Sequence, residues 1–133
     1  MNIPVDRTSI TASHKAFNRA KEDIDRGISI AIYPEATIPE CSPDVGPFKN
    51  GAFKLAIDKQ IPIVPITYLD NWDIFPDRKD QRFLCRPGLS RIIIHKPIET
   101  VGMGDADVSA LRERVRELIK KTMKEHGSIC RPN

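Results

Sequence analysis

The sequence of 133 residues has few cysteines, few aromatic residues and no long apolar run. Its three cysteines, Cys41, Cys85 and Cys130, are scattered, odd in number and without a C-x-x-C pair. This pattern argues against a disulfide framework, so we expect free thiols in a reducing compartment. No segment approaches the roughly 20 apolar residues that span a bilayer, and residues 1–9 lack the pattern of a signal peptide. We therefore expect any membrane anchor of the parent protein to lie outside this chain or to be a surface patch.

Several catalytic and binding signatures are also missing. There is no G-x-G-x-x-G, no Walker lysine loop and no G-x-S-x-G elbow, which argues against a nucleotide-binding α/β protein and a serine hydrolase. The histidines His14, His95 and His126 have no metal-ligand spacing, so no metal site is expected. The net charge of +3 comes without a basic stripe interleaved with aromatics, so no nucleic-acid partner is expected. A mild positive excess does suit an anionic substrate or lipid headgroups.

Strand-like and helix-like segments alternate along the chain. Apolar residues recur at helical spacing over 12–24, 48–59 and 107–126, while β-rich apolar runs cover 28–33, 61–69 and 90–96. This order predicts an α/β fold with a mixed, mostly parallel sheet covered by helices. We expect one domain over residues 1–126 and an irregular tail over 127–133.

Three positions are candidates for a binding site. Glu35 follows an apolar run at the rim of the predicted sheet, where ligands of α/β proteins bind. Lys49, Gly51 and Lys54 lie at a predicted helix start, where backbone N–H groups attract anions and glycine permits close approach. Arg7 ends the first short apolar segment and has a planar fork suited to phosphate. Each also has a simpler interpretation: a solvated loop carboxylate, solvated helix lysines, and a surface ion pair with Asp6.

Taken in order, these segments resemble the lysophosphatidic acid acyltransferase family (1-acyl-glycerol-3-phosphate acyltransferases and relatives). The family's apolar-aspartate-arginine step is seen as IPVDR at 3–7, and its F-P-E-G-T-R block as YPEATI at 33–38. Its apolar block with a central proline is seen as IPIVPI at 61–66, and FKNGAF at 48–53 matches the segment between these two blocks. The resemblance covers residues 1 to about 70 and implies a glycerolipid acyltransferase-like fold, incomplete at the N-terminus.

The chain departs from the family pattern in two places. The family's N-H-x-x-x-x-D block supplies a histidine base and the aspartate that orients it, and no H-x-x-x-x-D occurs here. The resemblance places this block upstream of Met1, so we expect the chain to be a C-terminal fragment that is inactive alone. Ala36 and Ile38 also replace the family's glycine and arginine beside Thr37. Because those loop residues help hold the acceptor phosphate, their replacement argues against a phosphate-bearing acceptor unless Arg7, Lys49 or Lys54 compensates.

For the intact protein the resemblance implies an acyltransferase of phospholipid biosynthesis. A fatty acyl group passes from acyl-CoA or acyl carrier protein to the hydroxyl of a lysophospholipid such as 1-acyl-glycerol-3-phosphate. No bound cofactor or metal is needed. Substrate-binding residues would be Arg7, Glu35, Ala36, Thr37, Lys49, Gly51 and Lys54. The expected location is the cytoplasmic face of a membrane, of the bacterial inner membrane type, with the membrane surface as a partner.

Two other functions remain open from the residues. One is an O-acyltransferase for a lyso-aminolipid acceptor, which the missing loop arginine favours. The other is a non-catalytic module that binds an acyl lipid or an anion, which the missing H-x-x-x-x-D block favours. An in-frame H-x-x-x-x-D encoded upstream of residue 1 would distinguish the enzyme from the binding module.

Overall fold

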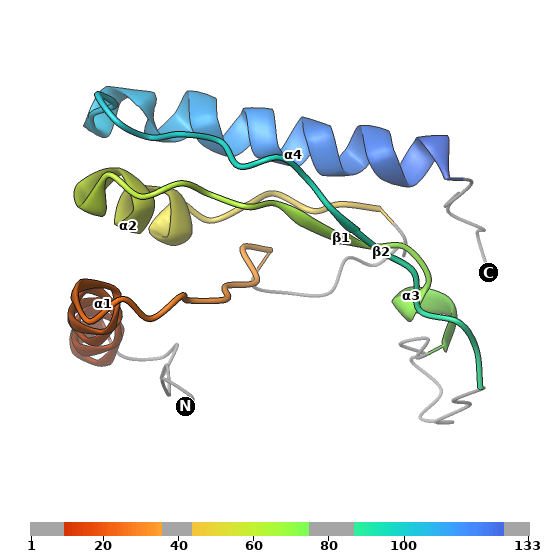
Figure 1. The fold of residues 1–133 in the computed structure, drawn as a ribbon, viewed down its shortest axis with the longest axis horizontal. Coiled ribbons are helices and arrows are strands. Elements are labelled where there is room, and N and C mark those ends of the chain that lie inside the picture. The colour runs from red at the N-terminus through yellow and green to blue at the C-terminus, as the bar shows by residue number, and fades with distance from the viewer. Residues whose placement is uncertain (1–9, 36–43, 75–86, 127–133) are drawn as a thin grey trace.

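The computed structural model describes residues 10–35, 44–74 and 87–126. Arg7, Ala36, Thr37, the three cysteines and the tail at 127–133 lie outside these ranges. In chain order the elements are α1 (Ile10–Asp25), α2 (Gly51–Lys59), β1 (Ile66–Tyr68), α3 (Asn71–Ile74), β2 (Ile92–Ile94), the 3₁₀ turn η1 (Asp105–Asp107) and α4 (Val108–Glu125). Helix α4 lies along one side of the molecule, α2 lies beside it, and α1 packs on α2 at one end (Figure 1).

The three long helices confirm the periodicity of the sequence. Helix α1 ends just before Gly27, whose φ of 80° is left-handed backbone that favours glycine. Asp107 is the residue before α4, but its side chain does not cap that helix. Instead its carboxylate Oδ2 accepts a hydrogen bond from the Gly104 backbone N–H, at 2.8 Å. The carboxylate therefore stabilises the 3₁₀ turn that leads into α4.

The predicted strands at 61–69 and 90–96 are present but short. Strands β1 and β2 pair antiparallel, with Thr67 opposite Ile93, and an isolated bridge joins Ile63 to Ile98. Pro62 and Pro65 have no N–H to donate to a neighbouring strand. Strand pairing in this segment is therefore limited to Ile63, between the two prolines, and to β1 after them. Within the described residues the sheet is thus an antiparallel pair rather than mostly parallel.

The prediction of a buried strand at 28–33 was wrong. This segment is extended but carries no strand assignment, and Tyr33 is 78% exposed. A strand needs a neighbour to satisfy its backbone groups, and no described segment pairs with this one. Its apolar side chains therefore lie at the surface of the described chain.

The core lies between α2, α4 and the segments that precede them. Its buried members are Val45, Phe48, Phe53, Ile57, Ile98, Val108, Leu111 and Val115. The rings of Phe48 and Phe53 stack with centroids 6.2 Å apart. Because Val45 and Phe48 belong to this cluster, the stretch before α2 is anchored to the core and fixes where α2 begins.

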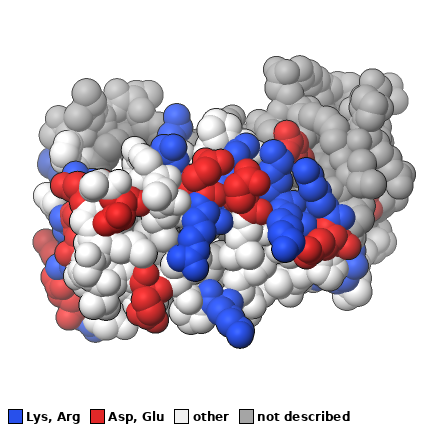
Figure 2. Space-filling model, turned by 90° about the horizontal axis from the view of Figure 1, so that it is seen from above, with Lys and Arg blue, Asp and Glu red and all other residues white. Residues whose placement is uncertain are grey.

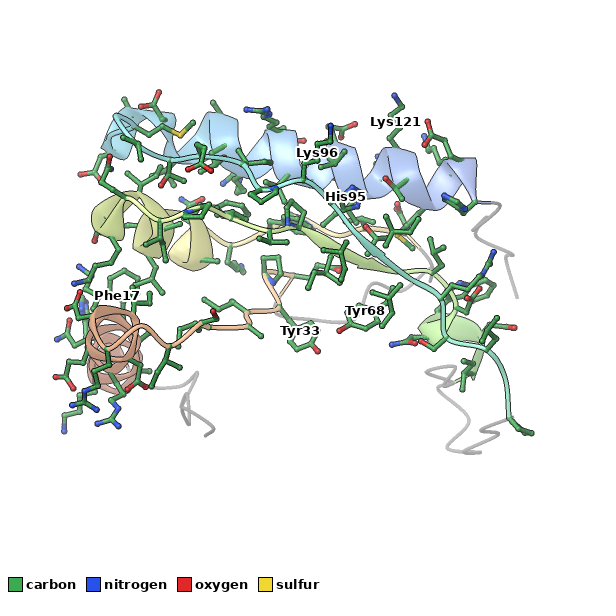
Figure 3. All side chains as sticks on the ribbon, in the orientation of Figure 1. Phe17, Tyr33, Tyr68, His95, Lys96 and Lys121 are labelled. Atoms are coloured by element: carbon green, nitrogen blue, oxygen red, sulfur yellow. The ribbon has the colours of Figure 1, made fainter. Side chains whose placement is uncertain are left out.

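One face of the two-stranded sheet is packed and the other is open. Thr67 is 1% exposed, whereas Ile66, Tyr68, Ile92 and Ile94 on the opposite face are exposed. Tyr33 and Tyr68 both lie on the side of the strands away from α4 (Figure 3). An apolar face of this kind is a surface on which association or coverage by further chain is expected.

Candidate functional site

The turn at Pro34 and Glu35 is fastened to the stretch that leads into α2. The Lys49 N–H donates to the Pro34 carbonyl oxygen at 2.8 Å. The Gly46 N–H donates to the Glu35 carboxylate oxygen Oε2 at 3.2 Å. Two segments that the sequence offered as separate candidates, Glu35 and the residues around Lys49, therefore lie side by side.

Helix α4 supplies the residue that holds this arrangement, Arg116. Its guanidinium donates to the carbonyl oxygens of Gly46 at 3.0 Å and Val45 at 3.2 Å. One turn earlier, Arg112 donates to the side-chain oxygen of Asn50, the residue before α2, at 2.7 Å. We call Arg112 and Arg116 the clamp flank of α4.

The charged residues from Arg112 to Lys124 do not form one solvated face, because the clamp flank is turned toward the stretch before α2. Arg112 and Arg116 directly follow the buried residues Leu111 and Val115. Each lies about 100° around the helix from that buried stripe, at its edge rather than opposite it. That spacing could have identified both arginines, but their partners more than 60 residues earlier could not be read from the sequence.

Glu35 lies in an electrostatic environment of mixed sign. Burial raises the pKa of the Glu35 carboxyl above its usual 4.5 because the charged form loses hydration. The Gly46 N–H opposes this rise, Asp44 adds to it, and Arg116 opposes it. A half-buried carboxylate held this way can accept a hydrogen bond from a ligand hydroxyl or ammonium group.

The other predicted residues around α2 differ in their surroundings. Lys49 is exposed beside the Pro34 turn. Gly51 begins α2, and a side chain added there would meet no described atom within 4 Å. The Lys54 ammonium pairs with Asp105 at 3.8 Å, so its charge is directed to the 3₁₀ turn before α4. The structure therefore joins Glu35 with Lys49 and gives Lys54 a different partner.

His95 occupies a structural position. Its Nε2 lies 2.9 Å from the hydroxyl of the buried Thr67, and burial lowers the pKa of the imidazole below its usual 6.5. In residues 10–35, 44–74 and 87–126, no three His, Cys, Asp or Glu side chains are placed to share a metal ion. None of the helices in those ranges has the length and apolar character needed to cross a membrane.

Comparisons with known proteins identify the family to which the chain is similar. The family model described as Acyltransferase matches residues 1–69. The mouse 1-acyl-sn-glycerol-3-phosphate acyltransferase alpha is 31% identical over 102 residues, which cover 77% of this chain and 35% of the mouse protein. The human beta enzyme is 33% identical, over 92% of this chain and 45% of its own length. The chain thus spans less than half the length of these relatives.

The fold is shared with a solved acyltransferase. The crystal structure of the 1-acyl-sn-glycerophosphate (LPA) acyltransferase PlsC from Thermotoga maritima superposes with a TM-score of 0.72 at 22% identity. The match covers 90% of this chain and 47% of that one, and supports the predicted glycerolipid acyltransferase fold. The YPEATI and IPIVPI blocks both lie within the segment matched by the family model, which covers more than half of the sequence. The chain belongs to the acyltransferase family, among relatives named as 1-acyl-sn-glycerol-3-phosphate acyltransferases.

Proposed function

We propose that this chain forms the acceptor-binding part of an enzyme that transfers a fatty acyl group from a thioester to the hydroxyl of a lysophospholipid. The observation that carries the proposal is the family match over residues 1–69, which contains the glutamate of the YPEATI block. The backbone N–H groups of Gly46 and Lys49 hold the turn that carries Glu35, and Arg116 in turn holds the carbonyl oxygen of Gly46, so the Glu35 carboxylate has a defined position.

The proposed chemistry is direct transfer. A histidine base, supplied by an H-x-x-x-x-D block that this sequence does not contain, removes the proton of the acceptor hydroxyl. The oxygen attacks the thioester carbonyl carbon, a C–O bond forms and the C–S bond breaks, and the protonated histidine returns the proton to the leaving sulfur to release the thiol. Glu35, Lys49 and Arg7 orient the acceptor's polar group so that the hydroxyl reaches the thioester.

The acceptor is proposed to be a 1-acyl-glycerol-3-phosphate or a related lysolipid. Lys49 and Arg7 supply positive charge for a phosphate. Ala36 and Thr37, which belong to the same YPEATI block as Glu35, complete the proposed acceptor site. A lyso-aminolipid is the second candidate, because Ile38 stands where the family has an arginine. The donor is acyl-CoA or acyl carrier protein. The site of action is the cytoplasmic face of a membrane, where both substrates are found together.

The first experiment measures acyl transfer by the 133-residue chain, with mass-spectrometric detection of the product. With acyl-CoA or acyl carrier protein and lysophosphatidic acid, we expect rates about 100- to 10,000-fold below those of a protein in which an H-x-x-x-x-D block precedes this chain. Equal rates for the two proteins would contradict the assignment of the base. No transfer by either, together with retained lysolipid binding, would favour the non-catalytic binding module.

The second experiment tests the acceptor residues in the active protein. Arg7→Ala is expected to lower kcat/KM by about 10- to 150-fold through loss of a charge-assisted contact. Glu35→Gln keeps the shape and removes the charge, so its effect separates electrostatics from packing. Lys124→Ala, on an exposed position of α4, is the control. Unchanged activity in both site variants with lysophosphatidic acid and with a lyso-aminolipid would refute these roles.

A further inference from the structure

A groove lies on the side of α4 opposite the clamp flank. Its volume is about 690 Å³, and its walls are the segment that follows β2 and the middle turns of α4. The volume falls within the range of roughly 300–1,000 Å³ that small-molecule sites occupy. His95 and Lys96 lie on the segment after β2, and Lys121 lies on the helix that runs alongside it (Figure 3).

The groove has an apolar floor and a cationic rim. Ile98 is buried and Leu118 half-buried at its base, while Lys96, Arg114 and Lys121 are exposed along its edges. Arg114 and Lys121 are seven residues apart, two helical turns, which separates them by about 10 Å along the axis. Lys96 faces them from the other wall, so three cations surround one opening.

These cations are poorly compensated. Across the described ranges 10–35, 44–74 and 87–126, neither Lys96 nor Arg114 forms an ion pair or a side-chain hydrogen bond. Lys121 has only a long pair with Glu125, at 3.7 Å between exposed groups, which contributes little. Some cations elsewhere do have close partners, as in the Lys59–Asp25 pair at 2.6 Å and the Lys21–Asp58 pair at 2.7 Å.

The single carboxylate in the groove does not neutralise it. Glu117 lies 3.4 Å from Arg116 and is drawn toward the clamp flank. The surface on the α4 side shows Lys and Arg side chains gathered along the helix with Asp and Glu between them (Figure 2). Three cations around an apolar floor suit a dianion that carries an apolar or aromatic body.

We propose that this groove binds a phosphomonoester attached to an apolar or aromatic body. A phosphomonoester carries about −1.5 to −2 charges at pH 7 and offers three acceptor oxygens, which a guanidinium and two ammonium groups satisfy together. The 3′-phosphate of coenzyme A, whose adenine is flat and aromatic, has this chemistry. The headgroup of phosphatidate, which continues into apolar chains, has it as well. The inference does not depend on acyl transfer, because the experiment measures only the binding of the ligand.

The experiment is calorimetric titration of the 133-residue chain, with flotation on vesicles in parallel. Coenzyme A is compared with dephospho-coenzyme A, and phosphatidylcholine vesicles containing phosphatidate are compared with vesicles containing phosphatidylglycerol, a phosphodiester. We expect one phosphomonoester probe to bind at least tenfold more tightly than its matched partner, and which pair responds identifies the source. Inorganic phosphate is expected to bind more weakly than that probe because it leaves the apolar floor unused.

Variants assign the binding to the groove. Arg114→Ala and Lys96→Ala are each expected to weaken binding about tenfold or more. Glu117→Gln should strengthen it, because it removes the one negative charge that faces the ligand. Lys124→Ala removes the same charge from the same helix away from the groove and should change nothing. Equal thermal unfolding midpoints confirm that each variant is folded.

Three results would overturn the proposal. The first is the absence of binding to both coenzyme A and phosphatidate vesicles. The second is equal binding of each phosphomonoester probe and its matched partner. The third is equal weakening by Arg114→Ala and Lys124→Ala, which would mean that a general positive potential, not the groove, attracts the anion.

Discussion

The two flanks of α4 carry the same kind of side chain but differ in what lies beside them. On the clamp flank, Arg112 and Arg116 meet the Asn50 side chain and the carbonyl oxygens of Val45 and Gly46. On the groove flank, Arg114 and Lys121 border a cavity across from Lys96. Arg112 and Arg116 therefore bind other parts of the fold, whereas Arg114 and Lys121 of the same helix face open space.

The difference follows from the neighbours and not from the residues. An arginine contributes to stability when its donors replace water with fixed acceptors that would otherwise be unsatisfied. The carbonyls before α2 are such acceptors, because this stretch is bound into the core by Val45 and Phe48 and cannot form helical bonds. Among the described residues Arg114 forms no hydrogen bond to the segment after β2, which carries the cation Lys96, so the groove flank keeps its charge for a ligand.

The largest expected effect on stability comes from a buried residue of α4 that lies between the two flanks. Leu111 is 3% exposed within the core cluster. Leu111→Ala is expected to lower the free energy of unfolding by about 2–5 kcal/mol, through lost burial and the cavity left behind. Chemical denaturation of both proteins measures it. A change smaller than that produced by Arg116→Ala would mean that polar clamping, not apolar packing, dominates the stability of α4.

The next largest effect is expected on the clamp flank. Arg116→Ala removes a charged donor from two carbonyl oxygens and should lower the free energy of unfolding by about 1.5–3 kcal/mol. Arg112→Ala removes one bond to an exposed side chain and should lower it by about 0.5–1.5 kcal/mol. The matched control is Lys124→Ala on the same helix. If all three variants unfold at the same denaturant concentration, the clamp contributes nothing to stability.

The two flanks are also expected to respond to pH in opposite directions. The pKa of Glu35, beside the clamp flank, is raised above 4.5, so the folded state keeps its proton longer than the unfolded state. Relative to Glu35→Gln, the wild type should lose stability as pH rises from about 4.5 through the raised pKa. Thermal unfolding across this pH range tests the sign, and a difference that grows in favour of the wild type would contradict it.

His95, beside the groove flank, gives the reverse dependence. Its pKa is lowered below 6.5, so the unfolded state takes up the proton first as pH falls. Relative to His95→Asn, the wild type should lose stability as pH drops below 6.5, with no further loss below the folded-state pKa. The same unfolding series measures this. A wild type that gains stability over that interval would show that the imidazolium is held by an anionic neighbour.

The smallest effect on stability is expected from the groove flank itself. Arg114 is exposed and lines the open side of the groove. Arg114→Ala should change the free energy of unfolding by no more than about 0.5 kcal/mol, while weakening phosphomonoester binding. Denaturation and titration on the same preparation separate the two readouts. A loss of stability as large as that of Arg116→Ala would remove the distinction between the flanks.

The sequence by itself determined the helices, the candidate segments and the family. Apolar spacing at 12–24, 48–59 and 107–126 predicted α1, α2 and α4, because one apolar face per helix is a local pattern. The YPEATI and IPIVPI blocks led to the acyltransferase family because they keep their order along the chain. The roles of Arg7 and Glu35 in acceptor binding remain predictions.

The tertiary structure alone decided how strands pair and where charges lie. The run at 28–33 reads as a buried strand, but a strand needs a partner from elsewhere in the chain and the described residues supply none. The spacing of the charges along α4 does not name their partners, yet Arg116 donates to a carbonyl oxygen 70 residues earlier while Arg114 borders the groove. Periodicity reports the direction of a side chain around its own helix. Only packing brings a distant acceptor, or an open groove, to meet it.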